Sequence, residues 1–249
     1  MCDTCGCGNP TLTGHHHHHT QSEHMHAHSH EHSKKVEIGQ SVLAKNNAFA
    51  QQNRDFFASK GLLVLNIISS PGSGKTTLLQ RMAEKYGGKM AVVVGDLQTR
   101  RDADRIVEAG SKAYQIETGG ACHLDAHSVG HAIEHLDLEG VEILVIENVG
   151  NLVCPAAYDL GEQLKVAILS TPEGDDKVLK YPSIFSRISV LLINKVDLLE
   201  FLDFDPQKAV DECSSLNEHF EVCNVSAKTG AGLADFFAML DAKVAARKS

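Results

Sequence analysis

The sequence has no long hydrophobic run and no surplus of basic residues. No segment reaches the roughly 18 consecutive apolar residues that a membrane-spanning helix needs, and the polar N-terminus lacks the apolar stretch of a secretory signal. The formal net charge is -9 with the histidines neutral, and the basic residues form no stripe. We therefore expect a cytoplasmic protein that binds neither membrane nor nucleic acid.

The first 32 residues have almost no side chains that could build a hydrophobic core, yet they hold ten of the fifteen histidines and three of the seven cysteines. Cys2, Cys5 and Cys7 form a C-x-x-C-x-C cluster. Thiolates and imidazoles are the ligands that borderline-soft divalent metals prefer. A polyhistidine run can be an expression tag, but this one has five histidines and follows a cysteine cluster, which favours a native metal-binding tract. The histidines of this tract are His15, His16, His17, His18, His19, His24, His26, His28, His30 and His32.

The composition changes near residue 36. Residues 1–35 are polar and low in complexity, so we predict a Cys/His-rich metal-binding tail that is disordered without metal. Residues 36–249 are long enough for one α/β domain with a leading helix over 36–60. Short apolar runs then alternate with amphipathic stretches, which is typical of a parallel sheet buried on both faces. Strands are predicted over 62–68, 90–95, 113–117, 142–146, 165–170, 190–193 and 221–225, and helices over 75–86, 103–109, 122–136, 206–219 and 233–246.

A glycine-rich motif follows the first predicted strand. The segment S-S-P-G-S-G-K-T, from Ser69 to Thr76, opens the next predicted helix, and in this context backbone N–H groups and a helix N-terminus bind phosphate. We expect Lys75 to reach the β- and γ-phosphates and Thr76 to bind Mg²⁺; Ser69 departs from the motif at its first glycine position. The motif predicts a three-layer P-loop NTPase with a mostly parallel central sheet of about seven strands. The residues assigned to phosphate are Gly72, Ser73, Gly74, Lys75, Thr76 and Thr77.

A second motif specifies the base. Asn194, Lys195 and Asp197 belong to an N-K-V-D segment at the end of the sixth predicted strand. A carboxylate there can accept hydrogen bonds from the N1–H and the amino group of guanine, a pair of donors that adenine lacks. An isolated N-K-x-D could be a surface turn, but its combination with the P-loop favours GTP. The loop expected to close over guanine is formed by Ser226, Ala227 and Lys228.

Two acidic residues end strands on the phosphate side. Asp96 ends the second predicted strand, and Glu147 ends the fourth in an E-N-V-G segment similar to the D-x-x-G switch of GTPases. We assign both carboxylates, with Thr76, to Mg²⁺, and the Gly150 N–H to the γ-phosphate. Asp96 joins Lys75 and Thr76 as a catalytic residue because it can orient the attacking water. Acids that merely cap helices are the alternative.

A second group of metal ligands lies within the domain. Cys122 and His123 are predicted to open a helix, and Cys154 follows the E-N-V-G segment, so both loops can approach the same edge of the sheet. Three soft ligands leave a tetrahedral shell open for water or a second subunit. Histidines then recur every four residues along one helix face, where a solvated polar surface is favoured over metal binding. They are His127, His131 and His135.

Taken together, these residues make the chain resemble the HypB family of hydrogenase nickel-incorporation GTPases from about Ile38 to its end. The most specific segments are C-H-L-D-A from Cys122, I-E-N-V-G-N-L-V-C-P from Ile146, K-Y-P from Lys180 and N-K-V-D-L-L from Asn194. The resemblance implies a slow GTPase and nickel metallochaperone that stores nickel and assists its insertion into the large subunit of [NiFe]-hydrogenase. A urease-type accessory GTPase, or a nickel-storage or detoxification protein with vestigial nucleotide binding, are the alternatives.

The resemblance also implies ligands and partners. Cys122, His123 and Cys154 would form a nickel or zinc site near the interface of a homodimer that depends on nucleotide or metal. The three tail cysteines would form a tight nickel site, and the histidine tract would store nickel. Implied partners are a HypA-type nickel accessory protein, the hydrogenase large subunit and, in some organisms, SlyD. Implied bound species are GTP, GDP, Mg²⁺, Ni²⁺ and Zn²⁺.

Overall fold

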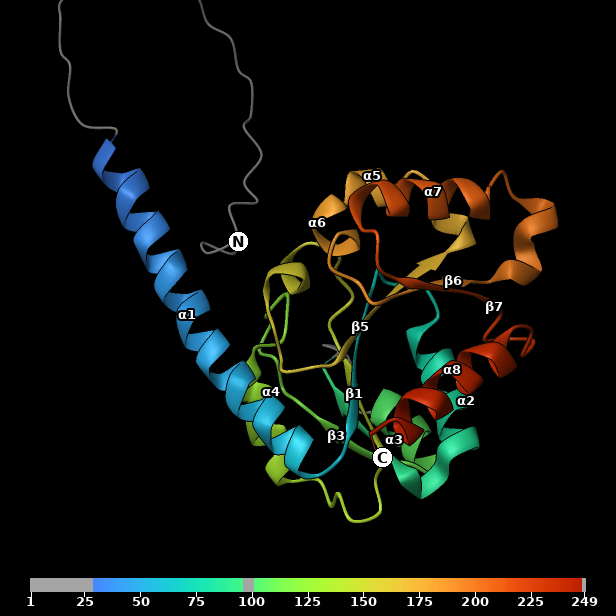
Figure 1. Ribbon diagram of the computed structural model, residues 1–249, viewed down its shortest axis with the longest axis horizontal. Coiled ribbons are helices and arrows are strands. Elements are labelled where there is room, and N and C mark those ends of the chain that lie inside the picture. Colours follow the sequence, from blue (N-terminus) through green and yellow to red (C-terminus); the bar gives the residue numbers. More distant parts are fainter. Residues whose placement is uncertain (1–28, 96–100, 248–249) are drawn as a thin grey trace, which may run out of the picture. The chain divides into compact units, whose positions relative to one another are not determined.

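The computed structural model describes residues 29–95 and 101–247 (Figure 1). The chain divides into two units, Met1–Lys45 and Asn46–Ser249. Helix α1, Ser29–Ser59, begins in the first unit, earlier than the predicted residue 36, and ends in the second. Cys2, Cys5, Cys7 and the histidines at positions 15–28 lie outside the described residues. Within the described ranges, no helix is long and apolar enough to span a membrane.

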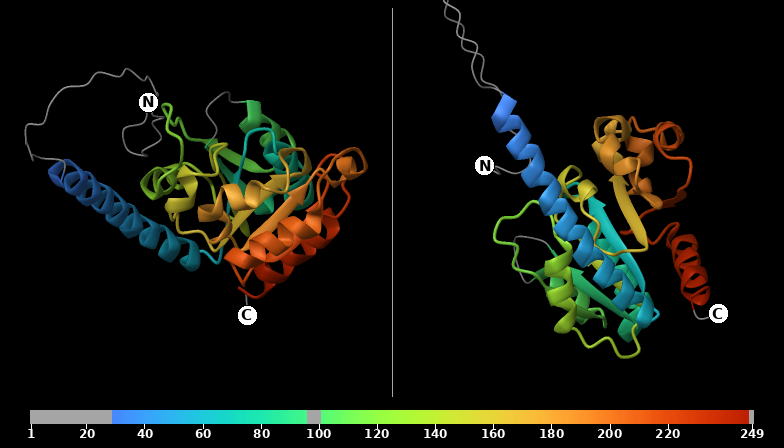
Figure 2. Two further views of the ribbon diagram at one scale, coloured as in Figure 1. Left: turned by 90° about the horizontal axis from the view of Figure 1, so that it is seen from above. Right: turned by 60° about the vertical axis from the view of Figure 1, so that its left-hand side comes forward.

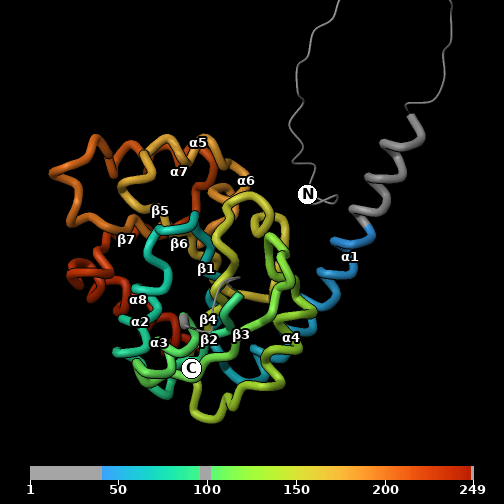
Figure 3. Tube along the Cα trace, turned by 180° about the vertical axis from the view of Figure 1, so that it is seen from behind, coloured from blue at the N-terminus to red at the C-terminus, as the bar shows by residue number. Residues whose placement is uncertain are grey.

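A seven-stranded parallel sheet forms the centre of the second unit, as far as the described residues extend. Its strand order is β3-β2-β4-β1-β5-β6-β7, and Figure 3 shows this sheet from behind. All residues of β1, β2, β4 and β6 are buried, whereas the edge strand β3 is half-buried. The predicted parallel sheet is confirmed. The strands are β1 Leu63–Ser69, β2 Met90–Val94, β3 Lys112–Gln115, β4 Ile143–Glu147, β5 Leu164–Ser170, β6 Val190–Asn194 and β7 Glu221–Val225.

Helices cover both faces of this sheet, which gives the three layers (Figure 2). On one face α2, α3 and α8 pack around alternate strand residues such as Leu65 and Ile67. On the other face, α4 and the end of α1 cover β1, β2 and β4, while α5, α6 and α7 cover β5 and β6. Each large apolar side chain buried in this way contributes about 1.5–3 kcal/mol. The helices are α2 Lys75–Tyr86, α3 Arg101–Glu108, α4 Ala126–Glu134, α5 Lys177–Lys180, α6 Pro182–Phe185, α7 Pro206–Leu216 and α8 Leu233–Ala245, with 3₁₀ turns η1 Gly87–Lys89, η2 Cys154–Ala157, η3 Thr171–Glu173 and η4 Val196–Phe201.

The prediction that Cys122 opens a helix is wrong. Helix α4 begins at Ala126 because Asp125 is extended and its carboxylate accepts a hydrogen bond from the Ser128 N–H at 2.7 Å. Such a side-chain acceptor at the N-cap satisfies an N–H of the first turn and fixes the start of the helix. Asn46 supports the same start by accepting from the Ala126 N–H at 2.9 Å. Cys122 therefore lies in the loop between β3 and α4.

Strand register brings the ends of the central strands to one edge. Ile67 of β1 pairs with Glu147 of β4, and Val94 of β2 pairs with the same residue. On the other side of β1, Ser170 of β5 pairs with Asn194 of β6. The connection from β1 to β2 crosses the sheet in one direction, and the connection from the neighbouring strand β4 to β5 crosses it in the other. In such sheets ligands bind at the carboxyl ends of the strands near this switch point.

Candidate nucleotide and metal site

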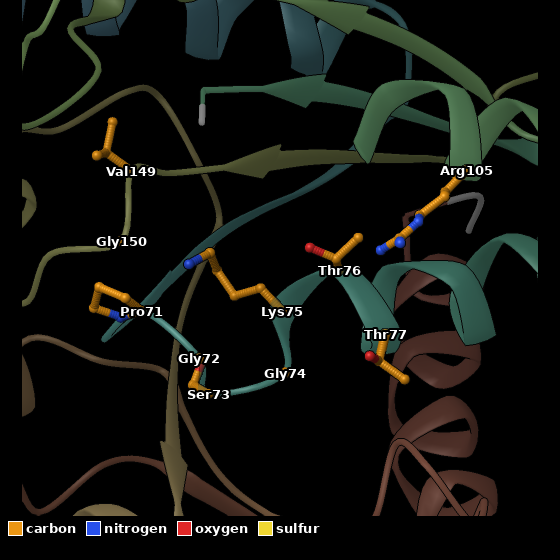
Figure 4. A pocket seen from close by; sticks show the side chains of 10 residues that line it. All are labelled: Pro71, Gly72, Ser73, Gly74, Lys75, Thr76, Thr77, Arg105, Val149 and Gly150. Atoms are coloured by element: carbon orange, nitrogen blue, oxygen red, sulfur yellow. The ribbon is translucent and has the colours of Figure 1, made fainter. Parts of the chain in front are cut away.

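A pocket of about 450 Å³ lies at this edge, where the loop after β1 meets the start of α2 (Figure 4). Gly72 and Gly74 have φ angles of 74° and 98°, which L side chains rarely adopt. A Cβ at Gly74 would also collide with the side-chain amide of Asn194. Backbone conformation thus requires glycine at both positions, and close packing requires it at Gly74 as well. The pocket is lined by Pro71, Gly72, Ser73, Gly74, Lys75, Thr76, Thr77, Arg105, Val149 and Gly150.

Ser69, at the departing position of the motif, is fully buried and organises the loop. The Lys75 ammonium donates to Ser69 Oγ at 3.0 Å, and the Ser73 hydroxyl donates to the same oxygen at 2.6 Å. Ser69 in turn donates to the carbonyl of Ser70 at 2.9 Å. The serine therefore fits the phosphate loop and holds the lysine beside the pocket.

The loops assigned to guanine converge on the phosphate loop through Asn194. Its amide donates to the Ser73 carbonyl at 2.7 Å, and its side-chain oxygen accepts from the Ala227 N–H at 3.0 Å. The Lys195 ammonium donates to the Gly72 carbonyl at 2.7 Å. Asp197 Oδ1 is buried and has no hydrogen-bond partner among the described residues. A buried acceptor of this kind suits a ligand that brings its own donors.

The structure describes two of the three candidate magnesium ligands. Thr76 is in the first turn of α2, and Glu147 is fully buried at the end of β4. Oxygen donors from a hydroxyl and a carboxylate fit a hard cation such as Mg²⁺. Gly150 lies against the phosphate loop, since a Cβ there would be 3.2 Å from Pro71 Cγ. Asp96 lies outside the described residues.

Cys122, His123 and Cys154 come together although His123 and Cys154 are 31 positions apart in the sequence. Their three ligand atoms all lie within 4.8 Å of one another, and Cys122 Sγ is 3.4 Å from His123 Nδ1. Burial lowers the pKa of His123, against a smaller opposing effect of Asp125. The imidazole is therefore neutral near pH 7 and can offer a lone pair to a metal. Two thiols and one imidazole form a soft donor set that fits nickel or zinc.

The structure adds residues that the sequence did not single out. Arg105 of α3 lines the pocket, and Figure 4 shows its side chain directed towards Thr76. The ring of Tyr158 lies against His123, with centroids 3.8 Å apart and the planes tilted by 30°. Neither residue belongs to a recognisable motif, and their roles depend on contacts between distant segments.

The remaining histidines and cysteines of the domain lie apart from this cluster. His127, His131 and His135 are exposed, and His135 caps α4 rather than belonging to it. The His131 and His135 rings are 5.0 Å apart. Burial raises the pKa of the Cys213 thiol to about 12, so this cysteine stays protonated and packs as an apolar residue.

The chain is similar to known proteins over most of its length. Residues 63–224 match the family described as CobW/HypB/UreG, nucleotide-binding domain. The chain is 51% identical over 212 residues to the hydrogenase maturation factor HypB of Azotobacter vinelandii, covering 84% of this chain and 70% of that protein. It is 44% identical over 207 residues to the hydrogenase/urease maturation factor HypB of Helicobacter pylori, covering 82% and 86%. A crystal structure of HypB from Helicobacter pylori in complex with nickel matches with a TM-score of 0.77 and 43% identity, covering 80% of this chain and 95% of that one.

Proposed function

Because the chain belongs to the CobW/HypB/UreG family, and within it to the HypB proteins, we propose that it is a GTPase that carries nickel and assists its insertion into the large subunit of a [NiFe]-hydrogenase. The names of its relatives and the nickel complex of a similar structure support this proposal. The observation that carries it is the cluster of Cys122, His123 and Cys154. Cys154 follows the loop whose Val149 and Gly150 line the phosphate pocket, so one loop serves both sites.

Hydrolysis in this proposal depends on positioning and charge. Phosphoryl transfer requires little covalent chemistry from a protein and is accelerated mainly by electrostatic stabilisation. Lys75 and the backbone N–H groups of the phosphate loop neutralise the developing charge, and Gly150 contacts the γ-phosphate. Thr76, Glu147 and Asp96 would hold Mg²⁺, which when bound neutralises charge on the β- and γ-oxygens. We assign to Asp96 the orientation of the attacking water.

In this proposal nickel is the ion that the chain takes up and passes on, and not a permanently bound cofactor. Three protein ligands leave one position of a four-coordinate shell open, and an open position suits an ion that must be taken up and released. Water or a second copy of the chain can fill it, so we propose a homodimer that forms with nucleotide or metal. Zinc competes for the same donor set.

The tail extends this role to storage. We propose that Cys2, Cys5 and Cys7 hold one nickel ion tightly, while the histidines from His15 to His32 bind several ions weakly. Imidazoles release metal when they are protonated, so the histidine-bound ions should be lost on acidification. The proposed partners are a HypA-type nickel accessory protein, the hydrogenase large subunit and SlyD.

The test measures GTP hydrolysis and nickel binding in the full chain. Lys75→Ala should abolish turnover, whereas Lys85→Ala, on the same helix but paired with Asp241 at 3.7 Å, should leave it unchanged. In a chain with Cys2, Cys5 and Cys7 changed to alanine, Cys154→Ser should weaken the nickel–thiolate absorption of the domain cluster, and the matched change Cys223→Ser should not. A parent chain with no GTP turnover above that of Lys75→Ala would favour the storage or detoxification alternative with vestigial nucleotide binding.

The name of one relative supports a second client enzyme, urease, as a recipient of nickel. The Helicobacter pylori protein is named for both hydrogenase and urease maturation. Restoration of urease activity as well as hydrogenase activity in a host deleted for its own factor would assign both clients to this chain. Restoration of hydrogenase activity alone would assign hydrogenase as the client and exclude urease.

A further inference from the structure

Asn151 links the phosphate side of the site to both loops that carry metal ligands. It follows Gly150 directly and is half-buried. Its side-chain amide donates to the backbone carbonyl of Cys122 at 3.2 Å. Its side-chain oxygen accepts from the N–H of Val153, the residue before Cys154, at 2.8 Å. One carboxamide therefore fixes the backbone beside two of the three ligands of the cluster.

A second asparagine holds the same two segments together. Asn148 is fully buried, and its side-chain oxygen accepts from the Val149 N–H at 3.0 Å and from the Leu124 N–H at 3.3 Å. Its amide donates to Asn66 of β1 at 3.2 Å, which ties this point to the centre of the sheet. The loop with Cys122 and His123 is thus bonded on both sides of His123 to the segment that contains Gly150.

The two asparagines differ in their connections. Asn148 is bonded through Asn66 to a buried strand, whereas Asn151 directly follows Gly150, which lines the pocket. Gly150 lies against Pro71 (Figure 4). A Cβ atom added at Gly150 would be 3.2 Å from Pro71 Cγ. In the proposed function the Gly150 N–H binds the γ-phosphate, and this contact is taken to shift the backbone of the loop. Hydrogen bonds weaken steeply with misalignment. The shift therefore weakens the bonds of the Asn151 side chain to Cys122 O and Val153 N.

We propose that Asn151 is the positioning residue that couples the nucleotide state of the phosphate loop to the metal affinity of the Cys122, His123 and Cys154 cluster. The inference rests on the proposed function and names the residue through which it is regulated. A nucleotide changes metal affinity only if the two metal-binding states differ in their interaction with it, and the coupling is reciprocal. Asn151 supplies that difference because the same amide contacts Cys122 and the turn into Cys154.

The experiment uses the full chain with Cys2, Cys5 and Cys7 changed to alanine, so that the nickel–thiolate band reports the domain cluster. Ni²⁺ is titrated in the presence of GDP and of a non-hydrolysable GTP analogue. In this background protein the two nickel affinities should differ by roughly 5- to 150-fold, the usual range of coupling between sites. With Asn151→Ala the ratio should fall below about 2, while the band remains.

Two further variants separate coupling from simple damage. Asn217→Ala is the matched control, because the Asn217 amide donates to Ile188 O at 2.8 Å and its oxygen accepts from His219 N at 2.9 Å, away from the pocket. It should keep the full ratio. Asn151→Asp keeps the acceptor for Val153 and loses the donor to Cys122; its charge changes both affinities, but the ratio should fall as it does in Asn151→Ala.

The outcomes distinguish this inference from the proposed function. Coupling that is intact in the background protein and unchanged by Asn151→Ala or Asn151→Asp overturns the role of Asn151 alone. Equal nickel affinities with both nucleotides in the background protein overturn the coupling as well, while leaving GTP turnover and nickel binding standing. Loss of the nickel band in Asn151→Ala with either nucleotide assigns the residue a structural role and also overturns the inference.

Discussion

Substitution of Asn194 tests whether its side-chain hydrogen bonds hold the loops of the nucleotide site together. Its side chain is only 1% exposed and connects the phosphate loop to the loop after β7, through Ser73 O at 2.7 Å and Ala227 N at 3.0 Å. Asn194→Ala removes the donor and the acceptor together. The Ser73 carbonyl and the Ala227 N–H are then left without their partner in a buried place.

The size of the effect follows from the two groups. A buried polar group that loses its partner costs about 1–3 kcal/mol. Two such groups, with some relief from water entering the space, should lower the free energy of unfolding by about 2–4 kcal/mol. Asn194→Asp keeps the acceptor for Ala227 but removes the donor and buries a carboxyl group against the Ser73 carbonyl, so it should cost at least as much. Nucleotide affinity should fall in the same order because both loops lose their connection.

Urea unfolding at neutral pH, with and without GDP, measures both quantities, since a bound ligand raises the free energy of unfolding by RT ln(1 + L/Kd), where L is the free ligand concentration. Asn224→Ala, at an exposed position of β7, is the control and should stay within about 0.5 kcal/mol of the parent protein. A loss below about 1 kcal/mol for Asn194→Ala would refute the reasoning, because it would mean that water satisfies both groups fully.

Two further predictions concern the base and a buried acid. Asp197→Asn replaces the acceptor for the guanine N1–H and amino group by a donor, so GTP affinity measured by calorimetry should fall by at least about 100-fold while ATP affinity stays low; retained GTP affinity would exclude Asp197 from base recognition. Burial raises the pKa of Glu173, despite a hydrogen bond from Ser170 at 3.2 Å, so the folded chain holds this proton more tightly than the unfolded chain. The free energy of unfolding should therefore decrease as pH rises through the raised pKa, and Glu173→Gln should flatten that decrease in urea titrations from about pH 4 to pH 7; parallel pH curves for the two proteins would contradict this origin.

The helices show where sequence reasoning succeeded and where it failed. Helix α2 matches its predicted range because Gly74 and Gly87, the residues that start and stop it, are adjacent to it in the chain. Helix α4 does not, because Asp125 caps it and the Ala126 N–H donates to Asn46 of α1, which lies 80 residues away. The spacing of apolar residues gave no such start and extended the predicted helix to Cys122. The local cap and the tertiary contact together place Cys122 and His123 on a loop, which is bonded to the segment around Gly150.

The motifs of this protein are short segments, so the sequence by itself predicted the parallel α/β fold, the phosphate loop and Asp197 as the candidate carboxylate for guanine. Each of these depends on residues that are neighbours in the chain, whose backbone conformation and donors are local properties. Only the tertiary structure decided which residues connect the loop after β4, which lines the pocket, to the loop of Cys122 and His123. The order of β3, β2 and β4 in the sheet brings the loop of Cys122 against that of Cys154. The amide of Asn151 can bond to Cys122 only when the two loops are in contact. Hydrogen bonds act over about 3 Å in space, whatever the separation in sequence.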